Sequence, residues 1–177
     1  MNDITISDRV RAVTVHRADA PIGRTARFHL NKRFSDLPCC HRSWSRHDKR
    51  VFLHGYELTF EIEFACTETE TRTGLVVNNR CLNEVRAALQ HQFDHTTLIA
   101  ADDPQRNLFE QLAGEGVIDL RIMNATSMEG AAAWVFDTVE HIVAPATDGR
   151  VWVSRIAARE SRNNVVTLTA EPEDRFD

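Results

Sequence analysis

The clearest pattern in the sequence is a strict alternation of apolar and polar residues between Tyr56 and Phe64. Alternation with a period of two is typical of a β-strand that has one buried face and one solvent-exposed face. His54 lies two residues before Tyr56, so we expect both side chains on the buried face. The apolar positions are Tyr56, Leu58, Phe60, Ile62 and Phe64, and the polar positions are Glu57, Thr59, Glu61 and Glu63.

A second strand is predicted to lead through Phe34 to His41, with Pro38 placing it at a sheet edge or at a bulge. A polar, basic loop separates His41 from His54. A β-hairpin can gather metal ligands when one strand carries a histidine and the next opens with His-Gly-aromatic. The pattern therefore predicts that His41 and the two residues of the second strand, His54 and Tyr56, converge on one point.

Two main helices are predicted by apolar residues at helical spacing. The first covers about 80–92 and is capped by Asn78–Asn79, and the second opens with a Thr126–Glu129 capping box and ends before Pro145. The other predicted elements are a short helix after residues 102–104 and strands over 4–15, 25–30, 117–123, 150–159 and 165–170. This order predicts an α+β fold, in which helices cover one face of an antiparallel sheet.

Length and composition favour one globular domain over residues 1–177. The chain has 177 residues, of which 42% are hydrophobic and 27% charged. Neither a membrane span nor a secretory signal is expected, because no apolar run is long enough and the first residues are partly acidic. The four cysteines, at positions 39, 40, 66 and 81, lack the spacing of a disulfide framework, so a cytoplasmic protein with reduced thiols is expected.

The net charge of −5 argues against nucleic acid as a partner. The charge is unevenly distributed, since residues 1–55 carry eleven Lys or Arg against five Asp or Glu. One interpretation is a solvated face, or complementary surfaces in an oligomer. The other is that the cations beside His41 and His54 bind a phosphorylated small molecule. Those cations are Arg42, Arg46, Lys49 and Arg50.

Six short motifs occur in an order that resembles a known family. They are CCHR at His41, HGY at His54, GLVVNN at 74–79, FDHTTL at Asp94 and His95, ATSMEGAAAW around Glu129, and AARES at Glu160. Together they resemble the 6-pyruvoyl-tetrahydropterin synthase family, which includes the 6-carboxy-tetrahydropterin synthases of deazaguanine biosynthesis. The resemblance extends from about Phe34 to Val166, so it leaves an extended N-terminus (about 1–30) and contains an inserted segment (about 100–123).

The resemblance implies the tunnelling fold (T-fold), in which sheets of neighbouring subunits join into an oligomeric barrel, usually a hexamer with active sites at subunit interfaces. It implies zinc held by three histidines, here matched by His41, His54 and Tyr56. It also implies an acid–base pair, matched by Asp94 and His95, that works with a cysteine. A late glutamate, matched by Glu160, would accept two parallel N–H bonds from the pterin ring.

Three departures from the family pattern stand at functional positions. Tyr56 replaces the second histidine of His-Gly-His, Arg50 occupies the loop that carries the family's cysteine, and Asn78 replaces an aspartate. Cys39 and Cys40 have the chemistry to bind zinc or act as thiols, but such residues are more often small buried hydrophobes. Asp94 and His95 are adjacent, so they form a pair only if the backbone turns suitably. Glu129 is better explained as a capping-box partner.

We therefore expect a diverged pterin-synthase-like enzyme, with a pterin or related heterocycle as its substrate. Zinc at His41, His54 and Tyr56 would assist lyase or elimination chemistry, Asp94–His95 would move protons, and Glu160 and Arg50 would bind the substrate. The alternative is a non-catalytic paralogue that binds a pterin-like ligand or serves as an oligomeric partner. A deazaguanine-pathway enzyme of ordinary activity is a third possibility, which a thiol in the pocket would favour.

Overall fold

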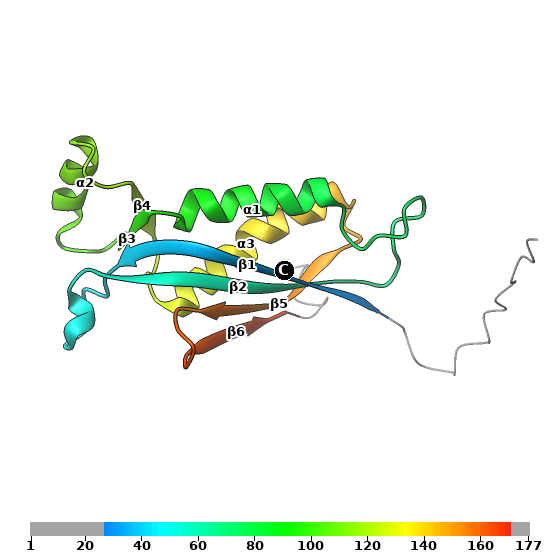
Figure 1. The fold of residues 1–177 in the computed structure, drawn as a ribbon, viewed down its shortest axis with the longest axis horizontal. Helices are drawn as coiled ribbons and strands as arrows, with labels where there is room; N and C mark the ends of the chain where they lie inside the picture. Colours follow the sequence, from blue (N-terminus) through cyan, green and yellow to red (C-terminus); the bar gives the residue numbers. More distant parts are fainter. Residues whose placement is uncertain (1–26, 171–177) are drawn as a thin grey trace, which may run out of the picture.

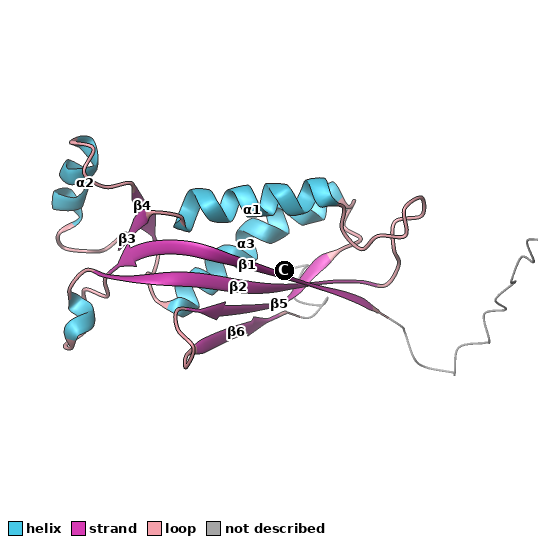
Figure 2. Cartoon of the chain, viewed as in Figure 1, coloured by secondary structure: helices cyan, strands magenta, loops and turns pink. Residues whose placement is uncertain are grey.

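The computed structural model describes residues 27–170 as a six-stranded sheet with two long helices on one face and a short helix at one end (Figures 1 and 2). The strands are β1 (Phe28–His41), β2 (His54–Cys66), β3 (Thr96–Ala100), β4 (Leu120–Met123), β5 (Trp152–Arg159) and β6 (Val165–Thr169). The helices are α1 (Asn79–Phe93), α2 (Arg106–Gly114) and α3 (Met128–Ala146), with a 3₁₀ turn at Lys49–Val51. The strand predicted over 4–15 lies outside the described residues.

The sheet has the order β4-β3-β1-β2-β5-β6. Strands β1, β2, β5 and β6 pair antiparallel, as the sequence predicts, while β3 pairs parallel to both β1 and β4. The sheet is therefore mixed, because β3 follows α1 and runs in the same direction as β1. The parallel pairings bring the chain after Phe93 alongside the end of β1, where His41 lies.

The alternation from Tyr56 to Phe64 places the apolar side chains of β2 beneath α1 and α3. Phe60 is fully buried and contacts Phe93 of α1, with ring centroids 5.0 Å apart. Phe93 in turn contacts Trp134 of α3 at 5.3 Å. Aromatic contacts of this kind add to the stabilisation from apolar burial. The core thus fixes both helices against the sheet and defines where the N-terminus of α3 lies.

A register shift interrupts the pairing of β1 with β2 between Phe34 and Leu37. Asp36 within the shift has a positive φ of 63°, a conformation that aspartate adopts more readily than most residues. The shift ends just before Pro38, which pairs with Glu57, and β1 lies inside the sheet between β2 and β3, so Pro38 is itself neither at a sheet edge nor in the bulge. The pairing recovers before Cys39 and places His41 directly opposite His54.

None of the helices within residues 27–170 has the length and apolar content that crossing a lipid bilayer requires.

Candidate functional site

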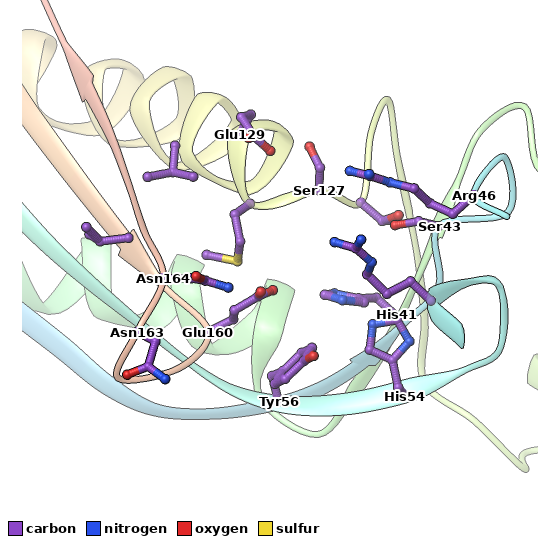
Figure 3. Close-up of a pocket in the computed structure, with 15 residues that line it drawn as sticks. His41, Ser43, Arg46, His54, Tyr56, Ser127, Glu129, Glu160, Asn163 and Asn164 are labelled. Carbon is purple, nitrogen blue, oxygen red and sulfur yellow. The ribbon is translucent and has the colours of Figure 1, made fainter. Parts of the chain in front are cut away.

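A cavity of about 390 Å³, here called the first cavity, opens where the ends of β1 and β2 meet the N-terminus of α3 (Figure 3). Four segments that are distant in sequence line it. They are the end of β1 with the basic loop after it, the start of β2, the turn into α3, and the turn between β5 and β6. The cavity therefore exists only in the folded chain.

His41, His54 and Tyr56 form one side of the first cavity and lie together, as predicted (Figure 3). The ring centroids of His41 and His54 are 4.6 Å apart, and Tyr56 lies 5.6 Å from His41 and 5.4 Å from His54. Strand register is the cause, because His41 faces His54 across the hairpin and Tyr56 follows two residues later on the same face.

Hydrogen bonding and burial set the protonation of the two histidines. His54 Nδ1 lies 2.7 Å from the carbonyl oxygen of Phe52, which only accepts, so Nδ1 carries a proton and Nε2 is left as the ligand nitrogen. His41 is buried, and this burial, with His54 beside it, lowers the pKa of His41 to about 4. Its imidazole is therefore neutral at physiological pH, the form that binds metals.

The donor set for a metal ion at this place is two imidazoles, of which that of His41 is neutral, and one phenol. Within residues 27–170, no group of three or more His, Cys, Asp or Glu side chains is arranged to hold a metal ion. The convergence of His41, His54 and Tyr56 and the free Nε2 of His54 fit a metal ion only if the phenol oxygen of Tyr56 is the third protein ligand.

Glu160 and Arg50 complete the predicted binding residues of the first cavity. Glu160 directly follows β5, at the turn that leads to β6. Asp48 binds the Arg50 guanidinium at 2.5 Å, and Asp48, with smaller contributions from Glu160 and Tyr56, raises the pKa of Arg50. Arg50 therefore interacts electrostatically with both Glu160 and Tyr56 within the cavity.

The sequence predicts the start of α3 one residue too early. Ser127 is the N-cap, and its hydroxyl accepts a hydrogen bond from the backbone N–H of Gly130 at 3.2 Å. Thr126 Oγ1 donates instead to the carbonyl oxygen of Arg42 at 2.7 Å. The prediction of a Thr126–Glu129 capping box is therefore wrong, because the Thr126 side chain instead links the turn before α3 to the residue after β1.

Glu129, released from the cap, lines the first cavity and lies opposite His41 and Tyr56 (Figure 3). Its own backbone N–H, the Ser127 hydroxyl and the nearby Arg46 lower the pKa of Glu129, so its carboxylate is ionised. The cavity thus holds two carboxylates, Glu129 and Glu160, and two guanidinium groups, Arg46 and Arg50. The sequence interpretation missed Glu129, and the only signal for it was its place in the ATSMEGAAAW motif.

Arg42 does not line the first cavity but connects it to the inserted segment. Its Nε and Nη2 donate to both carboxylate oxygens of Asp103 at 2.7 Å, and the Asp103 side chain has no exposed surface. The Arg42 guanidinium also lies 5.6 Å from the ring centroid of Phe109 in α2. Of the four predicted phosphate-binding cations, Arg46 and Arg50 line the cavity, whereas Arg42 is used in this buried pair.

Asp94 and His95 do form a pair, but they lie away from the first cavity. Asp94 Oδ1 accepts from His95 Nδ1 at 2.6 Å, which leaves Nε2 of His95 as the basic nitrogen. The contact between adjacent side chains is possible because His95 has a positive φ of 57°, and its backbone N–H donates to Pro38 at 2.7 Å. The imidazole of His95 is 84% exposed.

His95 lines a second cavity, of about 560 Å³, beside β1 and β3. The sequence did not predict this cavity, which also contains Cys40, Glu57 and Val117. Tyr56 lines both cavities, so the two are neighbours at the start of β2. Asn78, where the family has an aspartate, caps α1 by accepting from the Cys81 N–H at 2.9 Å.

Comparison with known proteins identifies relatives of the whole described region. The family model of 6-pyruvoyl tetrahydropterin synthase matches residues 29–171. No curated protein gives a significant match to the sequence.

Three solved structures show the same fold. An uncharacterized protein from Wolinella succinogenes has a TM-score of 0.68 at 17% identity, and the match covers 82% of this chain and 99% of that one. A catalytic-residue mutant of Plasmodium vivax 6-pyruvoyltetrahydropterin synthase gives 0.59 at 16%, with the same coverage. The Caenorhabditis elegans synthase gives 0.56 at 16%, covering 84% of this chain and 99% of its own. These matches confirm the predicted T-fold for the chain.

Proposed function

The chain belongs to the 6-pyruvoyl tetrahydropterin synthase family, and we propose that it is a diverged member that binds a pterin or related heterocycle and acts on the side chain of that ring. The observation that carries this proposal is the composition of the first cavity. Glu160 and the pair His41–His54 line the same space, with Arg50 and Tyr56 beside Glu160. The cavity thus combines a carboxylate that can accept hydrogen bonds from the edge of a heterocycle with imidazoles that can contact the oxygen atoms of the side chain of that ligand.

Glu160 is the proposed anchor of the heterocycle. A carboxylate accepts two parallel N–H bonds from a 2-amino-4-oxopyrimidine, and each charge-assisted bond contributes about 1.5–3 kcal/mol. Asn163 and Asn164 line the cavity on the same side as Glu160 (Figure 3) and offer further amide donors and acceptors to a polar ring. Arg46 and Arg50 suit a phosphate on the side chain of the ligand, because guanidinium groups bind phosphate bidentately.

His41, His54 and Tyr56 are the proposed holders of zinc. A bound zinc ion would act as a Lewis acid toward the hydroxyl or carbonyl oxygens of the ligand's side chain, which suits lyase or elimination chemistry. Neutral His41 and the free Nε2 of His54 support this assignment. Without metal, the same three groups still orient side-chain oxygens through hydrogen bonds.

Asp94 and His95 are the proposed acid–base pair. His95 Nε2 can accept a proton while Asp94 fixes the ring and stabilises its charged form. Since His95 lines the second cavity and not the first, we propose that a neighbouring copy of the chain supplies the Asp94–His95 pair to the first cavity in a homo-oligomer. The 84% exposure of the imidazole in the single chain supports such a role, because it leaves the base accessible to a partner.

The second candidate function is a non-catalytic paralogue that binds a pterin-like ligand or serves as an oligomeric partner. One observation favours it, namely that Tyr56 stands where a third histidine would complete the metal site and the described residues offer no replacement. In this case Glu160 and the guanidinium groups would still retain a ligand, with no bond broken.

Calorimetric titration of wild type, Glu160→Gln and Glu57→Gln with pterins and dihydroneopterin triphosphate, alongside turnover assays, tests both functions. We expect E160Q to weaken binding by roughly tenfold to a hundredfold, because one charged acceptor is lost. Glu57, which lines the second cavity, is the matched control and should leave affinity unchanged. Binding without turnover would favour the ligand-binding paralogue, and absence of binding by wild type would refute both the enzyme and the ligand-binding paralogue.

A further inference from the structure

The inserted segment contacts the basic loop (42–53) through two acidic side chains. The α2 helix of this segment and the 3₁₀ turn of the loop lie at the same end of the sheet (Figure 1). Both carboxylate oxygens of Asp103 accept from the Arg42 guanidinium at 2.7 Å, and this pair is buried. Asp102 Oδ1 accepts a hydrogen bond from the indole Nε1 of Trp44 at 3.1 Å. Two adjacent residues of the inserted segment thus bind the start of the basic loop.

Hydrogen bonds within the basic loop make it one unit. The Ser43 N–H donates to the carbonyl oxygen of Arg50 at 2.8 Å, which joins the two ends of the loop. Between them, the Arg46 N–H donates to the Ser43 carbonyl oxygen at 3.0 Å, and the Asp48 carboxylate accepts from the Arg50 N–H at 2.9 Å. A displacement of the start of the loop is therefore passed on to Arg46 and Arg50.

The basic loop brings two guanidinium groups to the first cavity, those of Arg46 and Arg50. The Arg46 side chain points toward Ser127 at the start of α3 (Figure 3). Asp48 binds Nε and Nη2 of Arg50 at 3.0 and 2.5 Å, which orients this guanidinium and leaves its Nη1 for a ligand. Because a guanidinium binds an anion through directed N–H bonds, its affinity for the anion depends on where the loop holds it.

We propose that the inserted segment positions the basic loop at the first cavity, and that Asp102 and Asp103 thereby make the cavity select ligands with an anionic side chain over uncharged ones. The inference rests on the proposed function, because it specifies the ligand class of the same cavity. Neither carboxylate lines the first cavity, so each is a positioning residue that acts through the loop residue it binds, Trp44 or Arg42. A loop that is held in place before binding loses less conformational freedom when the ligand arrives, and this raises affinity.

Charge and position act in opposite directions at Asp102. A negative charge repels an anionic ligand, so removal of the Asp102 charge alone should strengthen binding of an anion. Loss of the hydrogen bond to Trp44 should instead weaken binding, because the loop is then released at one of its two contacts with the inserted segment. The direction of the change therefore separates positioning from simple electrostatics.

Calorimetric titration of the full chain with inorganic triphosphate, dihydroneopterin triphosphate and dihydroneopterin tests the proposal. We expect Asp102→Ala to weaken binding of both triphosphates roughly threefold to tenfold, the effect of one lost hydrogen bond, and to leave binding of dihydroneopterin unchanged. Asp102→Asn keeps an oxygen acceptor for the indole N–H, so it should bind both triphosphates at least as tightly as wild type. Trp44→Phe should match Asp102→Ala, and combining the two should weaken binding no further.

Glu115→Ala is the matched control. Glu115 lies in the same inserted segment, is exposed and accepts from Gln111 at 3.0 Å, so its replacement removes one negative charge without releasing the basic loop. Its affinity for both triphosphates should not fall below that of wild type. Asp103 is left intact, because the loss of its ion pair with Arg42 would destabilise the whole fold. Thermal melting checks that each variant is folded.

An Asp102→Ala variant that binds inorganic triphosphate as tightly as wild type, or more tightly, would overturn the proposal. An equal loss of affinity for dihydroneopterin and its triphosphate would also overturn it, as would a wild type that binds no triphosphate. Inorganic triphosphate binding that depends on Asp102, in a protein that binds no pterin, would refute the proposed function alone. Pterin turnover with equal triphosphate affinities in wild type and D102A would refute only this inference.

Discussion

The two cavities share Tyr56, but they are built in different ways. The first cavity depends on segments from both halves of the chain. Two contacts of Arg42 hold the end of β1 in place, namely the buried ion pair with Asp103 of the inserted segment and the hydrogen bond that the Arg42 carbonyl oxygen accepts from Thr126 of the turn into α3. The second cavity lies along neighbouring strands, where register alone places Cys40 beside Thr97. Changes to long-range contacts should therefore affect the first cavity, while the second should depend on strand pairing.

The largest effect is expected from Asp103→Ala. This substitution leaves Arg42 buried without its partner, and the loss of one member of a buried pair costs about 3–5 kcal/mol of unfolding free energy. Urea unfolding measures it. Glu110→Ala, which breaks the exposed Arg106–Glu110 pair, is the matched control and should cost less than about 1 kcal/mol. Similar losses for the two variants would show that the Arg42–Asp103 pair does not hold the first cavity together.

The next effect is a pH dependence from His41. Its folded pKa of about 4 lies below the unfolded value of 6.5, so the unfolded chain binds more protons between these values. The contribution of His41 to the free energy of unfolding should be fully present above pH 6.5 and should fall by roughly 3 kcal/mol as the pH decreases to 4. Unfolding of metal-free wild type and His41→Gln across this range measures the difference. Identical slopes for the two proteins would contradict the assignment.

A smaller effect is expected from Gly130→Ala. A Cβ at this position would lie 2.4 Å from the carbonyl oxygen of Ala125, so α3 must shift at the end that lines the first cavity. Overpacking of this kind costs about 1–3 kcal/mol. Gly114→Ala, where a Cβ meets nothing within 4 Å, is the control and should not destabilise the protein. If both variants melt at the wild-type temperature, that result would contradict the close approach of Gly130 to the Ala125 carbonyl oxygen.

The smallest effect comes from the two N-caps. Ser127→Ala and Asn78→Ala should each cost about 1 kcal/mol, because each removes the acceptor of one backbone N–H. Only Ser127 lines the first cavity. We therefore expect equal losses of stability but weaker pterin binding for S127A alone, measured by unfolding and calorimetry. Equal affinities would exclude a contribution of the α3 N-terminus to binding.

The sequence by itself determined most of the elements and one side of the first cavity, although it did not predict strand β3. A period of two fixes the face of each β2 side chain, and hairpin pairing then requires His54 and Tyr56 to meet His41. The positions of both main helices and of Glu160 after β5 also follow from local patterns. These features are local because each depends on residues a few positions apart.

Only the tertiary structure decided the remainder. Thr126 does not cap α3 as predicted, because its hydroxyl donates to the carbonyl oxygen of Arg42. The helix therefore has Ser127 as its N-cap, and Glu129 lines the first cavity instead of completing a capping box. The left-handed backbone of His95 made its contact with Asp94 possible, and the fold placed the His95 side chain at the second cavity. Each outcome depends on contacts between distant segments, whose energies exceed the local preferences that a sequence pattern reports.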